Sequence, residues 1–255
     1  MTTVGAPTLT APLDLLLHLA DNALVLGQRN AEWCGNGPVL EEDIALANMS
    51  LDLIGQARML YQHAAVVQGD GATEDLLAYF RDAKDFRNFT LLELPHTSSS
   101  SERDYAVTIV RNFLYSAFML LVWEALQGSE DTQLAAIAGK SVKEVRYHFR
   151  HSRDWLVRLG DGTPESHDRT QAAVNLLMPY TAEFWLSPVI DHADTAALQA
   201  SWDEWVNEAF MEAGLKRPDV TATLPQGTRG RHSEHLAPLL SEMQGLARAH
   251  PGALW

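Results

Sequence analysis

One stretch dominates the hydrophobic pattern of the chain. Glu41–Val67 contains no proline and one glycine, and its apolar residues cover most of the circumference when it is drawn as a helix. A helix with this distribution is usually packed on several sides by other elements. The pattern therefore predicts a central helix, with the rest of the chain arranged around it.

A line of polar side chains interrupts this apolar helix. Asn48, Asp52 and Gln56 are spaced four residues apart and stack on one face, and His63 follows two turns later. An unpaired charge inside a protein is costly. Asp52 is therefore expected to face a metal ion, a substrate or other polar side chains.

Helical periodicity, ended by glycine or proline, predicts seven further helices, and no convincing strand alternation is present. Thr73 is a plausible cap for the short helix that follows it, Pro179 should kink another, and residues 86–94 should be irregular. The expected helices are Leu13–Trp33, Thr73–Phe80, Arg103–Gln127, Asp131–Leu159, Asp168–Trp185, Ala196–Gly214 and Ser233–Ala249.

The order of these elements indicates an all-α fold. Two long helices, a crossing segment of about 30 residues and two more long helices describe a ferritin-like four-helix bundle with one long crossover. We expect a single domain over residues 1–255. Its parts are a flexible arm at 1–12, the core bundle at 13–160, and additional helices and a C-terminal segment at 161–255.

Composition narrows the classes of function. The formal charge of −14 disfavours nonspecific binding to nucleic acid or to anionic membranes. A single cysteine, Cys34, excludes an intrachain disulfide and fits a reducing compartment. The N-terminus lacks the basic region of a secretory signal, and no run of about 18 uncharged apolar residues predicts a membrane span. The expected location is the cytoplasm.

Ferritin-like bundles often hold two iron ions, which require a glutamate from each of two helices and a Glu-x-x-His pair from each of the others. Helix 41–67 offers Asp52, but Gly55 occupies the imidazole position, and Gln56 is a poor substitute ligand. Helix 131–159 offers Glu144 with tyrosine three residues later. The polar residues available elsewhere on these two helices and on the other two are His148, His151, Asn112, Tyr115, Ser116, Glu124, Asp21 and Glu32.

This ligand set is incomplete on at least two helices. We therefore interpret Asp52, Gln56, Glu144 and His148 as a satisfied polar network, with Lys140–Glu144 and Glu144–His148 as pairs at i, i+4 spacing. An unusual metal site formed by the same residues is the alternative.

Three other motifs point to weaker candidates. Glu93 and His96 have the Glu-x-x-His spacing, but the intervening proline disfavours a regular helix. His232 and His235 could bind zinc, although a helix start capped by Ser233 explains the motif equally well. Cys34 is expected to be a packing residue, not a nucleophile.

The helix at 131–159 is also basic, and no glycine-rich phosphate loop accompanies it. A solvated face with salt bridges is the simplest interpretation, and an acidic partner or a nucleotide-bearing substrate is the alternative. The arginines concerned are Arg146, Arg150, Arg153 and Arg158.

Stretches that cover most of the chain resemble the C subunits of the bacterial phenylacetyl-CoA epoxidases. The alanine-rich helix around Asp52 and the His-Ser-Glu-His-Leu segment are the most specific. The matching stretches are Leu19–Gly35, Glu42–Arg58, Gln133–Gly160 and Gly230–Gln244, with a closing Pro-Gly and Trp255.

This resemblance implies a ferritin-like structural subunit that is similar to the catalytic A subunit but has lost the di-iron ligands. The A subunit would hold the irons and bind phenylacetyl-CoA, and a reductase would deliver electrons from NADPH through flavin and iron-sulfur centres. No cofactor and no catalytic, metal-binding or substrate-binding residue is assigned to this chain, and Asp52, Glu144 and His148 would be vestigial metal-site positions.

Two alternatives stay open from the residues. The chain could be a metal-dependent oxygenase with its own unusual site, or a homodimer that binds a CoA ester through its basic helix. Several tryptophans are candidate anchors for a partner, although ordinary core packing explains most of them: Trp123, Trp155, Trp185, Trp202, Trp205 and Trp255.

Overall fold

The computed structural model describes residues 10–97, 103–187, 194–219 and 226–253, and all regular structure within these ranges is helical. Short 3-10 segments occur at Ala83–Asp85, Thr90–Leu92, Met178–Leu186 and Gly227–Arg229. The α-helices are α1 (Leu13–Ala31), α2 (Leu40–Gln68), α3 (Glu74–Tyr79), α4 (Tyr105–Leu126), α5 (Thr132–Gly160), α6 (Pro164–Leu177), α7 (Thr195–Glu212) and α8 (Leu236–Ala249).

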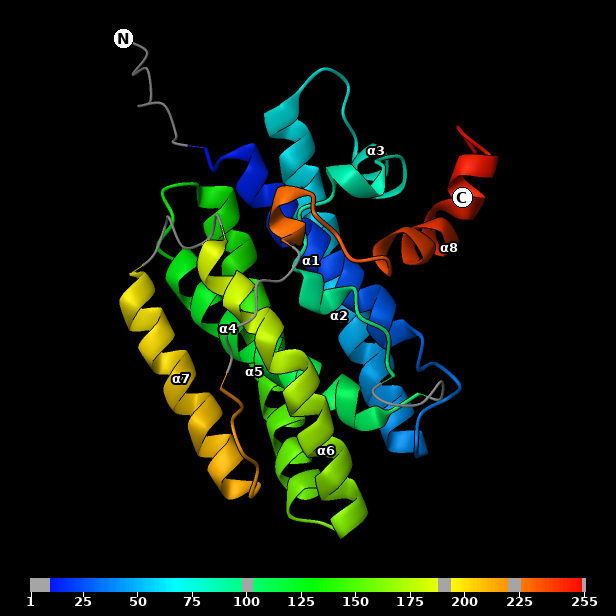
Figure 1. The fold of residues 1–255 in the computed structure, drawn as a ribbon. Coiled ribbons are helices and arrows are strands. Elements are labelled where there is room, and N and C mark those ends of the chain that lie inside the picture. The colour runs from blue at the N-terminus through cyan, green and yellow to red at the C-terminus, as the bar shows by residue number, and fades with distance from the viewer. Residues whose placement is uncertain (1–9, 98–102, 188–193, 220–225, 254–255) are drawn as a thin grey trace.

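The four long helices form two pairs. α1 packs along α2 and α4 along α5, and the pairs meet where α2 lies beside α5 (Figure 1). The crossover between α2 and α4 contains α3 and contacts α1 through Thr90–Leu92. α6 and α7 pack on the α4–α5 pair, whereas α8 packs on α3. This arrangement confirms the all-α, ferritin-like fold.

The central helix is α4, and the prediction that α2 is central was wrong. All but three residues of α4 are buried. In contrast, α2 leaves large apolar side chains in solvent, with Ile44 exposed by 52% and Leu51 by 66%. Its apolar residues form two stripes, and only one of them faces the bundle.

Helix starts follow the local sequence. The Thr73 side chain accepts a hydrogen bond from the Leu76 backbone N–H at 3.2 Å, which confirms the predicted cap of α3. Thr163 caps α6 in the same way, with Pro164 in the first turn. α6 therefore starts four residues before the predicted Asp168, and it passes into a 3-10 segment at Met178–Leu186 that contains Pro179.

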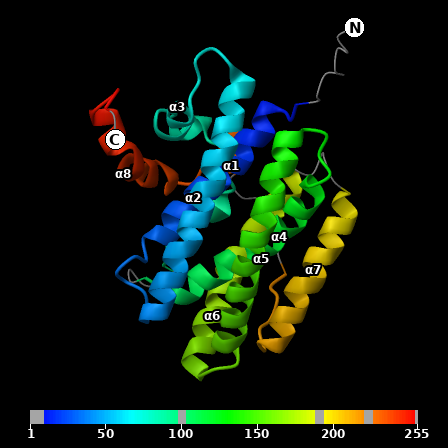
Figure 2. The ribbon, with the colours of Figure 1, turned by 180° about the vertical axis from the view of Figure 1, so that it is seen from behind.

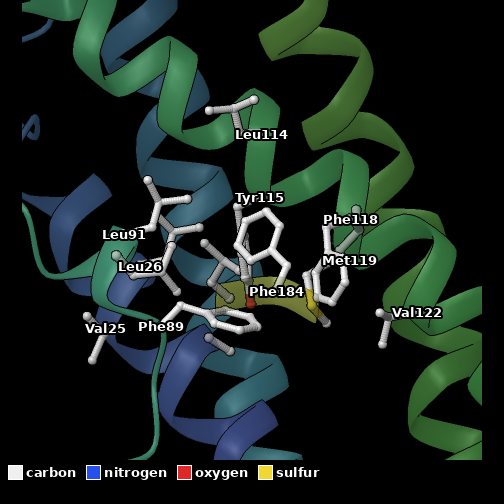
Figure 3. Packing of buried hydrophobic residues seen from close by; sticks show 14 of the residues in the cluster. Val25, Leu26, Phe89, Leu91, Leu114, Tyr115, Phe118, Met119, Val122 and Phe184 are labelled. Atoms are coloured by element: carbon white, nitrogen blue, oxygen red, sulfur yellow. The ribbon is translucent and has the colours of Figure 1, made fainter. Parts of the chain in front are cut away.

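The crossover places an aromatic side chain inside the bundle. Phe89 lies among residues of α1, α4 and the 3-10 segment after α6 (Figure 3). Its ring centroid is 4.9 Å from that of Phe184, 5.7 Å from Phe118 and 4.7 Å from His18. These edge-on contacts join the additional helices to the bundle core.

The predicted N-terminal arm is held against the bundle where it meets α1. Ala11 is buried, and its backbone N–H donates to Asp131 at 2.8 Å. Residues 1–9 and residues 98–102 lie outside the described residues. The division into a core bundle at residues 13–160 and additional helices at 161–255 stays a prediction.

Candidate functional site

The predicted polar residues of the long helices meet across the contact between α2 and α5. His148 Nε2 lies 3.0 Å from Asp52 Oδ2, and Gln56 Nε2 donates to Glu144 Oε2 at 2.8 Å. The His148 side chain is 4% exposed, and that of Asp52 is 36% exposed. Asp52 therefore lies at the rim of the interface, where water reaches it.

Three further contacts extend this polar row, one of them from α4. Glu42 accepts hydrogen bonds from Tyr105 Oη at 2.6 Å and from His151 Nε2 at 2.8 Å. His63 contacts the carboxylate of Asp131 at 2.7 Å. Each of these residues thus has a partner through at least one atom, but the buried Nδ1 of His151 has none among the described residues, so this part of the row is not fully satisfied.

The row differs from its prediction in three details. His148 contacts Asp52 on α2, and the predicted Glu144–His148 pair does not occur in the described part of the chain. Glu144 pairs with Gln56 on the facing helix, and no ion pair with Lys140 occurs among the described residues. Asn48 is exposed to solvent and takes no part in the row.

The interior of the bundle is lined by neutral groups where a di-iron centre would need carboxylates. Asn30 of α1 and Asn112 of α4 exchange side-chain hydrogen bonds at 2.9 and 3.0 Å. Ser116 donates to the Asn112 carbonyl at 2.5 Å, and Ser152 to the His148 carbonyl at 2.6 Å. Amides and hydroxyls already bonded to one another are poor ligands for iron.

The donor set of these described residues therefore does not fit a di-iron centre. Asp52 and Glu144 supply two carboxylates and His148 one imidazole, and each is already bonded to a neighbouring side chain. The carboxylates proposed on α1 are also engaged: Glu32 pairs with Arg29 at 2.7 Å, and Asp21 lies in a separate buried cluster.

Asp21 is the centre of an ion-pair cluster that the sequence did not reveal. Its side chain is fully buried and bonds the Arg81 guanidinium, the Tyr61 hydroxyl at 2.5 Å and the Arg87 backbone N–H at 2.7 Å. Burial and the Asp21 charge raise the pKa of the Tyr61 hydroxyl. The cluster fastens the crossover to α1 and α2.

Glu93 forms a second buried cluster. Its carboxylate accepts from Asn88 Nδ2 at 3.0 Å, from His232 Nδ1 at 2.6 Å, and from the backbone N–H and hydroxyl of Ser233 at 2.7 Å each. These bonds attach the segment before α8 to the crossover. Ser233 was predicted to cap the last helix, but that helix begins at Leu236 and its N-cap position is His235.

The Glu93 and His96 side chains do not converge as metal ligands. His96 contacts the Arg29 carbonyl at 2.7 Å and Thr108 Oγ1 at 2.6 Å. Burial lowers the pKa of His96, and the charge of Arg111 lowers it further. We found no group of three His, Cys, Asp or Glu side chains arranged to hold a metal in the described ranges.

The zinc alternative loses support for a similar reason. His232 is engaged by Glu93 and by the Phe86 carbonyl, while the His235 side chain is 37% exposed. Cys34 is exposed, so the prediction that it packs in the core was wrong. It follows the end of α1, in the turn before α2.

Because one histidine is buried, we expect the free energy of unfolding to fall at acidic pH. His18 is fully buried, and burial lowers its pKa from 6.5 to about 4, despite the raising effects of the Arg87 carbonyl and Asp21. Below pH 6.5 the unfolded chain binds a proton that the native chain excludes, so stability should fall by about 3 kcal/mol between pH 6.5 and 4. Urea unfolding at pH 7 and 4.5 measures the loss.

A His18→Gln variant provides the control for this prediction. It removes one of two buried histidines with a lowered pKa, so it should reduce the slope of the pH profile in this window, and His96 should supply slope that remains. An equal slope for both proteins would contradict the assignment to His18. Asp131, whose pKa is lowered mainly by backbone N–H donors against the opposing effect of burial, should act only at lower pH.

Comparison with known proteins agrees with this geometry. Residues 2–255 match the family described as phenylacetic acid catabolic protein. The chain is 44% identical over 247 residues to the C subunit of 1,2-phenylacetyl-CoA epoxidase from Escherichia coli (strain K12), covering 94% of this chain and 97% of that protein. The chain belongs to this family.

The match confirms the resemblance to the C subunits that the sequence indicates. One helix among the described residues, α4, is long and apolar enough to cross a membrane, but its apolar 18-residue window is wholly buried in the protein. In this chain α4 is thus a core helix.

Some of the basic residues of α5 form ion pairs with acidic residues of the same chain. Arg146 pairs with Glu124 at 2.9 Å and Arg153 with Glu212 at 2.6 Å, while the Arg158 guanidinium lies 5.5 Å from the centre of the Trp155 ring. Whether this helix contacts a CoA nucleotide stays a hypothesis.

The tryptophans serve mainly as core residues. Trp123 and Trp202 are each 1% exposed. Trp155, Trp185 and Trp205 are partly buried and pack against the core, and Trp255 lies outside the described residues. Core packing therefore explains Trp123 and Trp202, whereas Trp155, Trp185 and Trp205 keep part of their surface exposed.

Proposed function

We propose that this chain is a noncatalytic structural subunit of a phenylacetyl-CoA epoxidase. In this role it pairs with the di-iron catalytic A subunit in the cytoplasm and supports it during aerobic phenylacetate breakdown. The proposal rests on the near end-to-end similarity to a C subunit, together with the bonded Asn30–Asn112 pair in the bundle interior. That pair supplies no charge to balance two iron ions.

In this proposal, the chain holds no metal and the cofactors belong to its partners. The A subunit binds the irons and the phenylacetyl-CoA, and a reductase provides flavin, iron-sulfur centres and NADPH. The contribution of this chain is apolar helix surface that keeps the helices of its partner in place. Obligate interfaces of this kind bury about 2,000 Å² or more.

Metal content tests the proposal directly. Protein purified alone from iron-supplemented cells should contain close to no iron or zinc by elemental analysis, and the Asp52→Ala variant should keep the ability to restore activity to the A subunit. About two irons per wild-type chain, lost in Asp52→Ala, would instead indicate an oxygenase with its own site. Retention on immobilised CoA would favour the CoA-ester-binding homodimer.

A further inference from the structure

The exposed side of α2 carries an ordered apolar stripe. Leu40, Ile44, Leu51 and Ile54 are exposed by 72, 52, 66 and 37%, and the smaller Ala47 completes their alternating spacing of four and three residues. This is the spacing with which one helix packs along another. Apolar surface of this extent on one helix marks an interaction site.

The stripe adjoins a groove at its N-terminal end. The groove has a volume of about 460 Å³, and Val39, Trp33, Tyr105 and Trp155 are among the residues that line it. Val39 lines the groove and directly precedes Leu40, so the groove ends at the first residue of the stripe. A pocket of this kind suits one large anchoring side chain of a partner.

A basic row lies on the exposed side of α5, the helix that packs against α2. Lys140, Lys143 and Arg150 are exposed at helical spacing, with Tyr147 between them exposed by 40%. None of these three cations has an ion-pair partner within the part of the chain that the structure describes. α2 and α5 lie side by side on one open face of the protein (Figure 2).

We infer that this α2–α5 face binds a helix of the catalytic partner subunit. That helix presents apolar side chains at three- and four-residue spacing to the stripe, and Asp or Glu side chains to Lys140, Lys143 and Arg150. The inference rests on the proposed function and adds the contact surface and the charge of the partner helix.

Charge distinguishes this occupant from a second copy of the chain. Antiparallel pairing of two α2 helices about a twofold axis would place both α5 rows on the same side, with like charges opposed. Parallel pairing would bring the two acidic first turns together, each with Glu41, Glu42 and Asp43. An acidic partner helix avoids both repulsions.

Binding of the purified A subunit to the full chain tests the apolar stripe. Leu51→Glu should weaken binding by about 30-fold or more, because it buries an unpaired charge among apolar side chains. The control is Met211→Glu on α7, where the residue is 78% exposed and far from the stripe in sequence. It should leave Kd within about twofold, and circular dichroism should show both variants folded.

The charge of the partner helix is tested separately. Lys143→Glu with Arg150→Glu should weaken binding about fivefold and reduce its dependence on salt, whereas Lys216→Glu should do neither. Equal affinities for Leu51→Glu and Met211→Glu would overturn the inference. So would a Leu51→Glu variant that converts a wild-type dimer to a monomer while still binding the A subunit. If the wild-type chain does not bind the A subunit, the proposed function itself fails.

Discussion

Replacing Asp21 with alanine should lower the free energy of unfolding by about 3–5 kcal/mol, because it leaves a buried cation without its partner. The Arg81 side chain is 13% exposed, and its guanidinium lies 4.4 Å from the centre of the Phe86 ring. The variant also removes the acceptor for the Tyr61 hydroxyl and the Arg87 backbone N–H. Urea unfolding at pH 7 measures the loss.

Two further variants make the test specific to the buried pair. Asp82→Ala removes an aspartate that is 63% exposed and pairs with Arg248, so it should cost less than about 1 kcal/mol. Asp21→Ala combined with Arg81→Met should be less damaging than Asp21→Ala alone, because no buried charge is left behind. A loss below about 1 kcal/mol for Asp21→Ala would show that the pair contributes little.

Replacing Glu93 with alanine is the second large effect, with an expected loss of about 3 kcal/mol. Four hydrogen bonds end on this fully buried carboxylate, and three of them come from His232 and Ser233. Their buried donors would be left unsatisfied. The segment before α8 should then detach, which limited proteolysis followed by mass spectrometry detects as new cleavage near residue 233.

Glu234 offers a matched control for Glu93. Its side chain is 88% exposed, next to the same segment, so Glu234→Ala should change neither stability nor the cleavage pattern. If Glu93→Ala also remains resistant to protease, the attachment of this segment depends on apolar packing by α8 and not on the buried carboxylate.

The sequence predicted the helices well because their signals are local. The periodic apolar positions, the Thr73 cap and the glycine breaks each act within a few residues. The same reasoning misplaced the central helix, because periodicity shows which side chains share a face but not what covers that face. α2 has two apolar stripes, and only the packing reveals that one is exposed.

The candidate site was only partly predictable. Asp52, Gln56, Glu144 and His148 were identified as a network from their helical spacing, but their actual partners lie 88 to 96 residues away on the facing helix. The clusters around Asp21 and Glu93 likewise depend on contacts between distant segments. Their bonds span 40 to 66 and 5 to 140 residues, and no sequence pattern marks such pairs.

The contact between Ser233 and Glu93 also sets a minimum delay before the chain can complete its fold during synthesis. The two residues are 140 positions apart, so a ribosome working at about 5–20 residues per second needs roughly 7–28 s to supply the second after the first. During that interval the crossover carries a carboxylate that lacks most of its final partners. The nascent N-terminal half therefore cannot complete its contacts until a segment near the end of the chain is made. Chaperones have their longest access to it during that interval.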